Sequence, residues 1–279
     1  MLEICRHSNA GAFLTRAESW LIAREIEYAG AYASARAARR DDSRYQQPVF
    51  WATVEDDGGV IGCAYRTPPY KVGVTALPTA AIEPLVGSLR EFYQTVSGVS
   101  GPDETATALA RAWTARYGGT YAEAAGTRQR LLAATVVEPP PAAPPGTLRA
   151  ATSADEGLVR TWGNAAAGES GIAVLDGTLC VRLMQAGQLF VWDDDGRPRA
   201  MVGVLRATAQ GAGIGIVYTP MDWRRQGYAR AAVAALAARL LARGPRCFVY
   251  TDADSPPINA LARQLGFEAV HETVDVDIR

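Results

Sequence analysis

The fold of this chain is decided by the stretch Ile214-Gly-Ile-Val-Tyr-Thr-Pro-Met-Asp-Trp-Arg-Arg-Gln-Gly-Tyr-Ala-Arg230, which predicts a strand, a basic turn and a helix start in direct succession. Ile214, Ile216 and Tyr218 recur at the two-residue period of a strand, and Pro220 ends that pattern. Behind the turn, apolar residues recur at three- and four-residue steps, as on the buried face of a helix. These residues are Ala229, Val233, Leu236 and Leu240.

The basic turn has the composition of an anion-binding loop. Backbone N–H groups in the first turn of a helix lack partners within the helix and carry the positive end of its dipole, which favours a phosphate or a diphosphate. At Gly227 and Ala229 an anion can approach the backbone closely because no bulky side chain holds it away. Arg224, Arg225 and Arg230 add positive charge. We therefore predict that the turn binds a phosphorylated ligand.

This stretch resembles the acetyl-CoA loop of the GNAT N-acetyltransferase superfamily, in which Arg or Gln is followed by two residues, Gly, one residue, and Gly or Ala. Arg224, Gly227 and Ala229 fill the pattern, and residues 217–220 are similar to the preceding strand in many bacterial members. The resemblance implies that the strand pairs with the pantetheine arm of acetyl-CoA, the cosubstrate, while loop amides hold the diphosphate. The implied coenzyme-binding residues are Val217, Tyr218, Thr219, Arg224, Arg225, Gln226, Gly227, Tyr228, Ala229 and Arg230.

Two other phosphate-binding loops do not fit. The sequence has no Gly-x-x-x-x-Gly-Lys-Ser/Thr motif, which excludes a P-loop NTPase, and no Gly-x-Gly-x-x-Gly motif at a strand–helix junction, which disfavours a dinucleotide fold. An arginine-rich turn that only caps the helix is the plain alternative to the coenzyme loop.

The composition is that of a soluble globular protein with room for two domains: 279 residues, 48% hydrophobic and 20% charged. A net charge of −1 offers no general attraction to nucleic acid or an anionic membrane, so we expect neither as a partner. Four scattered cysteines and two histidines lack metal-ligand spacing, which predicts no metal site. The sequence has no signal-peptide layout and no apolar run of membrane-spanning length, so we expect a cytoplasmic protein. We expect it to be a monomer or a homodimer.

A proline-rich segment, Glu138-Pro-Pro-Pro-Ala-Ala-Pro-Pro-Gly146, separates two similar halves, since five prolines in nine residues favour a stiff, extended linker. Each half predicts a β-hairpin with an Asp-Gly turn, over residues 49–65 and 189–205. After its first strand and helices, the second half continues with three strands, a helix, a strand, a helix and a strand, which is the GNAT order. The first half has no Arg-x-x-Gly-x-Ala turn.

We therefore predict an α/β protein with a mixed α+β sheet, built from two GNAT-like domains in tandem. Residues 1–137 would form a degenerate domain without the coenzyme loop, which supports the second domain and walls the substrate cleft. Residues 138–146 would be the linker, and residues 147–279 the catalytic domain that binds acetyl-CoA.

A second motif near the end of the chain supports the resemblance. Asn259, Gly266 and Phe267 match the Asn and the Gly-Phe pair that GNAT enzymes carry there. The resemblance implies that Asn259 contacts the coenzyme, and a helix-capping role is the alternative. Family members usually place a proton-donating Tyr four residues before the Gly, where this chain has Ala262. Losing a positioned acid typically costs about 10²–10⁴-fold in rate.

These patterns predict an acetyl-CoA-dependent N-acetyltransferase that moves an acetyl group directly to an amine of a small molecule. The catalytic candidates are Tyr218 and Ser255, with Tyr228, Asp252 and the hairpin acids at residues 193–195 as further proton handlers; packing and turn formation are their plain alternatives. One alternative function is an acyl-CoA-binding or interaction module without activity. Another is an aminoacyl-tRNA-dependent transferase, which the balance of 14 basic and 14 acidic residues from position 147 onward disfavours.

Overall fold

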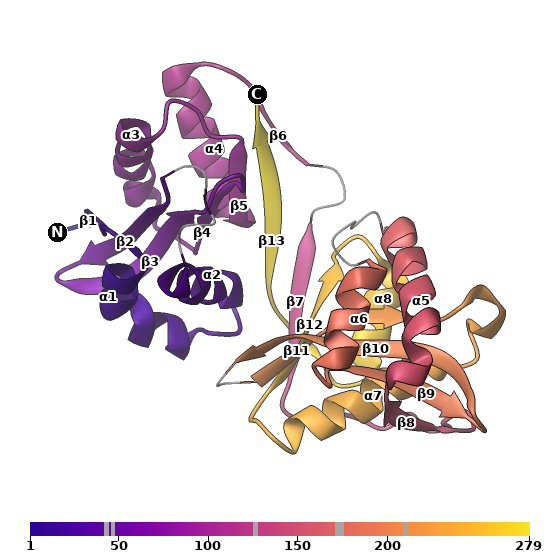
Figure 1. Cartoon of the computed structure of the whole chain (residues 1–279). Coiled ribbons are helices and arrows are strands. Elements are labelled where there is room, and N and C mark those ends of the chain that lie inside the picture. The colour runs from indigo at the N-terminus through magenta and orange to yellow at the C-terminus, as the bar shows by residue number, and fades with distance from the viewer. Residues whose placement is uncertain (42–44, 46–47, 125–127, 171–175, 209–210) are drawn as a thin grey trace. The chain divides into compact units, whose positions relative to one another are not determined.

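The computed structural model describes the chain except for residues 42–44, 46–47, 125–127, 171–175 and 209–210. It divides into two compact units (Figure 1). Unit 1 contains Met1–Arg130, Asp252–Asp254 and His271–Arg279, and unit 2 contains Leu131–Thr251 and Ser255–Val270. Strands and helices alternate in both units, so the predicted α/β class with a mixed sheet is confirmed.

The sheet of unit 1 has the strand order β1-β2-β3-β4-β5-β13, and β6 pairs with β13. Its strands are β1 (Glu3–Arg6), β2 (Phe50–Asp56), β3 (Gly59–Arg66), β4 (Val72–Val74), β5 (Gly98–Pro102), β6 (Tyr121–Glu123) and β13 (Glu268–Ile278). β4 and β5 run parallel, whereas the other pairs run antiparallel. Helices α1 (Ala10–Ala23) and α2 (Ala29–Arg40) pack around Trp51 on one face. A 3₁₀ turn (Thr79–Ala81), α3 (Ile82–Phe92) and α4 (Asp103–Tyr117) cover Phe50 on the other.

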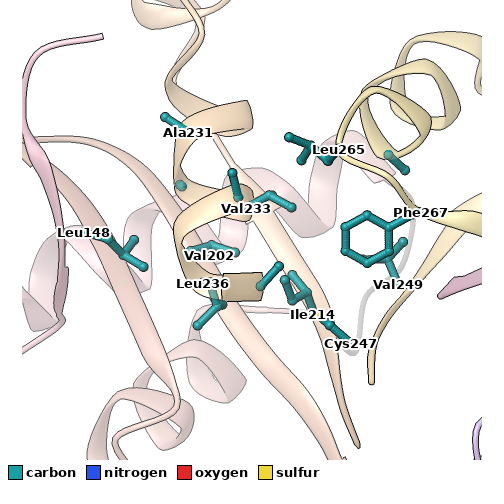
Figure 2. Packing of buried hydrophobic residues seen from close by; sticks show 14 of the residues in the cluster. Leu148, Val202, Ile214, Ala231, Val233, Leu236, Cys247, Val249, Leu265 and Phe267 are labelled. Atoms are coloured by element: carbon teal, nitrogen blue, oxygen red, sulfur yellow. The ribbon is translucent and has the colours of Figure 1, made fainter. Parts of the chain in front are cut away.

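The sheet of unit 2 has the strand order β8-β9-β10-β11-β12-β7. Its strands are β8 (Thr147–Ala150), β9 (Leu189–Asp194), β10 (Arg197–Thr208), β11 (Gly211–Tyr218), β12 (Cys247–Asp252) and β7 (Gln129–Ala134). A 3₁₀ turn (Ser153–Asp155), α5 (Glu156–Ser170) and α6 (Gly177–Gln185) pack on the face that carries Met201 and Ile216. On the opposite face, α7 (Tyr228–Leu241) and α8 (Pro256–Gln264) enclose a core that includes Val202, Ile214 and Phe267 (Figure 2).

Both predicted β-hairpins are present. Asp57 and Gly58 join β2 to β3 with φ values of 48° and 77°, and Asp195 and Gly196 join β9 to β10 with φ values of 52° and 75°. Two successive residues with positive φ are the signature of the turn whose twist matches that of paired strands, and Asp-Gly favours it. The repeated sequence pattern therefore reflects a repeated local structure.

The last strand of each sequence half lies in the unit that the other half builds. β7 comes from the first half, yet its residues from Leu131 onward belong to unit 2, where β7 is the neighbour of β12. The C-terminal part of β13 pairs with β5 in unit 1, with Val276 opposite Val99, and both side chains are buried in the same core. The compact units thus differ from the predicted boundaries at their terminal strands, because this exchange joins residues that are far apart in the sequence.

Helix α5 is fixed at its start and along its length. At its entry, Asp155 accepts a hydrogen bond from the backbone N–H of Thr152 at 2.8 Å, forming a capping box. Farther along, Gly163 lets α6 approach closely, because a Cβ there would lie 2.7 Å from Cys180 Sγ. Asn164 Oδ1 accepts the N–H of Gly177 at 3.0 Å. These contacts hold the later turns of α5 in a defined position.

Candidate functional site

Strands β11 and β12 are paired only along their first halves. Their parallel register runs from Ala212, opposite Cys247, to Ile214, opposite Val249. β11 continues to Tyr218, but within the described residues no pairing with β12 follows Ile214. On its other side β11 stays paired with β10 as far as Tyr218. One backbone edge of residues 215–218 is therefore left uncovered by β12.

A pair of bulges explains why the two strands separate. Between β10 and β11 the register shifts at Gly203/Val204 and again at Val204/Arg206, which leaves Gly215 and Leu205 without directly opposite partners. A bulge bends a strand and increases its twist. Glycine is required on β11 because a Cβ at Gly215 would lie 2.1 Å from Leu205 Cδ1. The Leu205 side chain thus fills the space beside the bulge, where β11 turns away from β12.

The loop after β11 ends in an uncapped helix. A 3₁₀ turn (Met221–Trp223) leads to Arg224, and the N-cap of α7 is Gly227 with φ 89°. Such a φ strains any residue with a Cβ, whereas glycine adopts it freely. No side chain caps α7, and its first turn contains no acidic residue. The predicted strand, loop and helix start are therefore present, and the N–H groups of α7 remain available to an anion.

Arg224 holds the loop against the end of β11. Its Nε donates to the carbonyl oxygen of Thr219 at 2.8 Å, and its Nη2 lies 2.8 and 2.7 Å from the two carboxylate oxygens of Glu169. The Glu169 carboxylate raises the pKa of Arg224 above its usual value, so this side chain stays charged. Glu169 lies on α5, which the sequence did not link to the loop. A lone acid near a helix end carries too little signal for that assignment.

Two buried polar atoms beside the loop have no hydrogen-bond partner among the residues that the structure describes. They are Thr219 Oγ1, just after β11, and Arg230 Nε, in the first turn of α7. An unpaired buried polar group costs about 1–3 kcal/mol. A ligand that reached these atoms would gain hydrogen bonds which the protein alone does not supply.

The remaining predicted loop residues divide by exposure. Val217 is 44% exposed at the end of β11, an unusual position for a β-branched apolar side chain, and Arg225 is exposed with φ 61°. Gln226 is also exposed, and its Nε2 donates to the Asp222 carbonyl at 3.0 Å. Tyr228 differs, because its ring is buried against Trp223. Only the backbone of Tyr228, together with that of the half-buried Ala229, is placed to serve a ligand.

Comparisons with known proteins agree with this geometry. Residues 195–276 match the family model described as FR47-like protein. A GNAT-family acetyltransferase from Colwellia psychrerythraea is 12% identical, with a TM-score of 0.63 over 99% of this chain and 100% of that chain. A GCN5-related N-acetyltransferase from Sphaerobacter thermophilus is 19% identical, with a TM-score of 0.59 over 99% and 95%. A tandem GNAT protein from the clavulanic acid biosynthesis pathway is 14% identical, with a TM-score of 0.53 over 100% and 98%. No curated protein matches this chain.

The chain has the GNAT fold. The resemblance drawn from the loop is confirmed at the level of the fold, and the alignment with a tandem GNAT protein runs the whole length of the chain. The matched family model covers β10, β11, the loop, α7, β12 and α8, which are the elements that form the candidate site.

In the GNAT fold of unit 2, the connection between β12 and α8 carries the second motif. Asn259 is 3% exposed; its carboxamide oxygen accepts from Thr251 Oγ1 at 2.7 Å and its Nδ2 donates to the Ser255 carbonyl at 2.9 Å. Asn259 therefore fixes the path of this connection, and its predicted contact with the coenzyme stays a prediction. Ser255 is half-buried at the N-cap of α8, and its side chain does not cap the helix. Ala262 is buried in the core below.

The corresponding place in unit 1 is built differently. After β4, Thr75 Oγ1 accepts the N–H of Cys63 at 2.8 Å, and the N–H of Leu77 donates to Thr105 Oγ1 at 3.1 Å. The chain then enters the turn Thr79–Ala81 and α3 without an arginine–glycine loop. Because these contacts tie the segment to β3 and α4, the described residues between β4 and α3 form no counterpart to the loop of unit 2.

Outside the loop, other chemistry would require metal-binding groups, reactive thiols or cavities among the described residues. These residues contain no group of three or more His, Cys, Asp or Glu side chains arranged for a metal ion, and no helix among them is long and apolar enough to cross a membrane. Burial raises the pKa of Cys63 and Cys247 to about 12 and that of Cys180 to about 11, which keeps these thiols protonated. A cavity of about 230 Å³ in unit 1, at residues 6–8, 49–51 and Phe92, includes none of the predicted site residues.

Proposed function

We propose that unit 2 binds acetyl-CoA along the uncovered edge of β11 and at the start of α7, and transfers the acetyl group directly to an amine of a small molecule. The observation that carries the proposal is the separation of β11 from β12 after Ile214, directly before an uncapped helix. An extended pantetheine arm needs such a strand edge, and a diphosphate needs such a helix start. The GNAT fold and the FR47-like match support an acetyltransferase.

Coenzyme binding and acetyl transfer would depend on a few groups of the loop and of β11. The amides of residues 225–229 and the charges of Arg225 and Arg230 would hold the diphosphate. The exposed Val217 would lie against the apolar part of the pantetheine arm. Backbone N–H groups on the uncovered edge of β11 would stabilise the negative oxygen that forms when a neutral amine attacks the thioester carbonyl. The carbonyl then re-forms as the carbon–sulfur bond breaks and the thiolate leaves; the nitrogen gives its extra proton to water, and the thiolate takes up a proton to become the CoA thiol.

Ala262 has no proton to give and is 4% exposed, so the proton for the leaving thiolate would come from another residue or from solvent. Tyr218, at the end of β11, is the first candidate. Ser255, whose hydroxyl is not used to cap α8, is the second. A positioned acid contributes about 10²–10⁴-fold to the rate.

The buried Ala262 also favours a second function, an acyl-CoA-binding module without transferase activity. The two functions predict the same coenzyme binding and differ in turnover. For either function we expect a cytoplasmic monomer or homodimer that needs neither nucleic acid nor membrane.

Acetyl-CoA binding tests both functions and is measured by isothermal titration calorimetry. We expect a micromolar dissociation constant for the wild type, weakened at least tenfold by Gly227→Val, because a β-branched side chain would crowd the anion and strain the left-handed N-cap. The matched control is Gly196→Val in the β9–β10 turn, where φ is 75° and the strain is similar. Equal binding by all three proteins would contradict the proposed site. Release of CoA thiol with a panel of amines identifies the transferase, and binding without release identifies the module.

A further inference from the structure

Helix α5 touches the end of β11 and the loop at two points. Trp162 packs on Tyr218, with ring centroids 6.0 Å apart, and Glu169 pairs with Arg224 at 2.7 Å. Trp162 and Glu169 are seven residues apart on α5, which is about two helical turns, so they lie on the same face of the helix. This face of α5 therefore borders the place where the thioester would lie.

The guanidinium of Arg224 occupies a site with the chemistry of a cation receptor. Its Nη2 donates to both carboxylate oxygens of Glu169, and its Nε donates to the carbonyl oxygen of Thr219 at 2.8 Å. Its Cζ lies 5.7 Å from the centroid of the Tyr218 ring. A carboxylate, a carbonyl and an aromatic face are the groups that hold an ammonium ion in proteins. Arg224 is thus the resident cation of a site that another cation could enter.

The ion pair is exposed enough to exchange partners. The side chain of Arg224 is 36% exposed and that of Glu169 is 49% exposed. Exposed pairs of this kind contribute little net free energy, because water competes for both members. Arg224 precedes the Gly227 N-cap by only three residues, so a diphosphate at the start of α7 would attract its guanidinium and repel the carboxylate of Glu169.

We propose that the coenzyme opens the Glu169–Arg224 pair: Arg224 turns to the diphosphate, and the carboxylate of Glu169 then binds the positive charge of the acceptor. This inference rests on the proposed function and names its substrate class. The acceptor is an amine with a second, cationic amino group, so that one group is held as an ammonium ion while the other loses its proton and attacks.

The test is Glu169→Gln, which keeps the size of the side chain and removes its charge. The matched control is Glu156→Gln on the same helix, where the acid pairs with Arg160 within α5. We measure acetyl-CoA binding by calorimetry, and CoA thiol release with 1,4-diaminobutane and with butylamine as a monoamine of similar length.

For Glu169→Gln we expect acetyl-CoA to bind about two- to fivefold more tightly, as the loss of one competing surface charge predicts, and the KM for the diamine to rise at least as much. The kcat should change less than the KM, the KM for butylamine should change less than the KM for the diamine, and Glu156→Gln should behave as the wild type. If the wild type binds no acetyl-CoA, the proposed function fails and takes this inference with it. If acetyl-CoA binds but Glu169→Gln leaves its affinity and the diamine KM unchanged, or if butylamine releases thiol and the diamine does not, the inference alone is overturned.

Discussion

The bulge at Gly215 should make unit 2 sensitive to one added methyl group at this position. Gly215→Ala places a Cβ 2.1 Å from Leu205 Cδ1, 2.5 Å from its Cγ and 2.8 Å from its Cβ. The terminal methyl can rotate away, but the Leu205 Cβ is fixed to the backbone of β10. Relief of the overlap therefore requires the two strands to move apart.

Overpacking of this kind typically costs about 1–3 kcal/mol, which for a unit of this size lowers the melting temperature by roughly 2–12 °C. Leu205→Ala removes Cγ and the terminal methyls, so in the double variant only the 2.8 Å overlap remains. We expect the double variant to lose about 1–2 kcal/mol less than the sum of the two single variants, since residues in contact couple by that amount.

Calorimetric melting of the wild type, both single variants and the double variant measures this coupling, with acetyl-CoA affinity as a second readout. Gly157→Ala on α5 is the control, because a Cβ there meets no atom within 4 Å and alanine favours a helix. Additive losses for Gly215 and Leu205 would refute the account of the bulge. So would a Gly215→Ala variant that is as stable as the wild type and binds the coenzyme equally well.

Three further predictions concern other parts of the chain. The Nζ of Lys71 lies 3.2 Å from a carboxylate oxygen of Asp275 and 2.9 Å from one of Asp277, both on β13. Lys71→Met should therefore lower the free energy of unfolding by about 1–2 kcal/mol, whereas Lys71→Arg should retain most of the wild-type stability. Equal melting temperatures for the two variants would exclude a role for the charge. Burial lowers the pKa of His271 from 6.5, so its contribution to stability is complete above pH 6.5 and is lost as the pH falls further. His271→Gln should therefore flatten the decline of the melting temperature between about pH 7 and pH 5, and an unchanged decline would contradict this. If the protein is a transferase, Tyr218→Phe should lower kcat about 10²-fold or more and Ser255→Ala less, and the reverse order would assign the donor to Ser255.

Local structure followed closely from the sequence. The alternation of Ile214, Ile216 and Tyr218 marked a strand, and Asp-Gly marked both hairpin turns, because these patterns depend on neighbouring residues only. The loop before α7 could also be predicted, since glycine at a left-handed N-cap and a run of arginines are local features, while its binding of the coenzyme stays a prediction. In each case the physical cause lies within a few residues of the pattern.

The exchange of β7 and β13 could not be predicted in this way. Val274 and Val276 alternate with acids, which indicates a strand with one buried face, but the alternation does not say which sheet supplies the partner. The same limit applies to Glu169, whose pairing with Arg224 joins positions 55 residues apart. The separation of β11 from β12 depends on how Leu205 packs on Gly215, which no periodicity reveals.

The exchanged strand has a consequence for the newly made protein. During synthesis, the edge of β5 has no partner strand until the segment from His271 onward has left the ribosome. Unit 1 is therefore synthesised first, but its sheet is completed last. A variant without β13 would keep the loop before α7 but leave the β5 edge of unit 1 unpaired, and an unpaired edge of this kind promotes association with other strands.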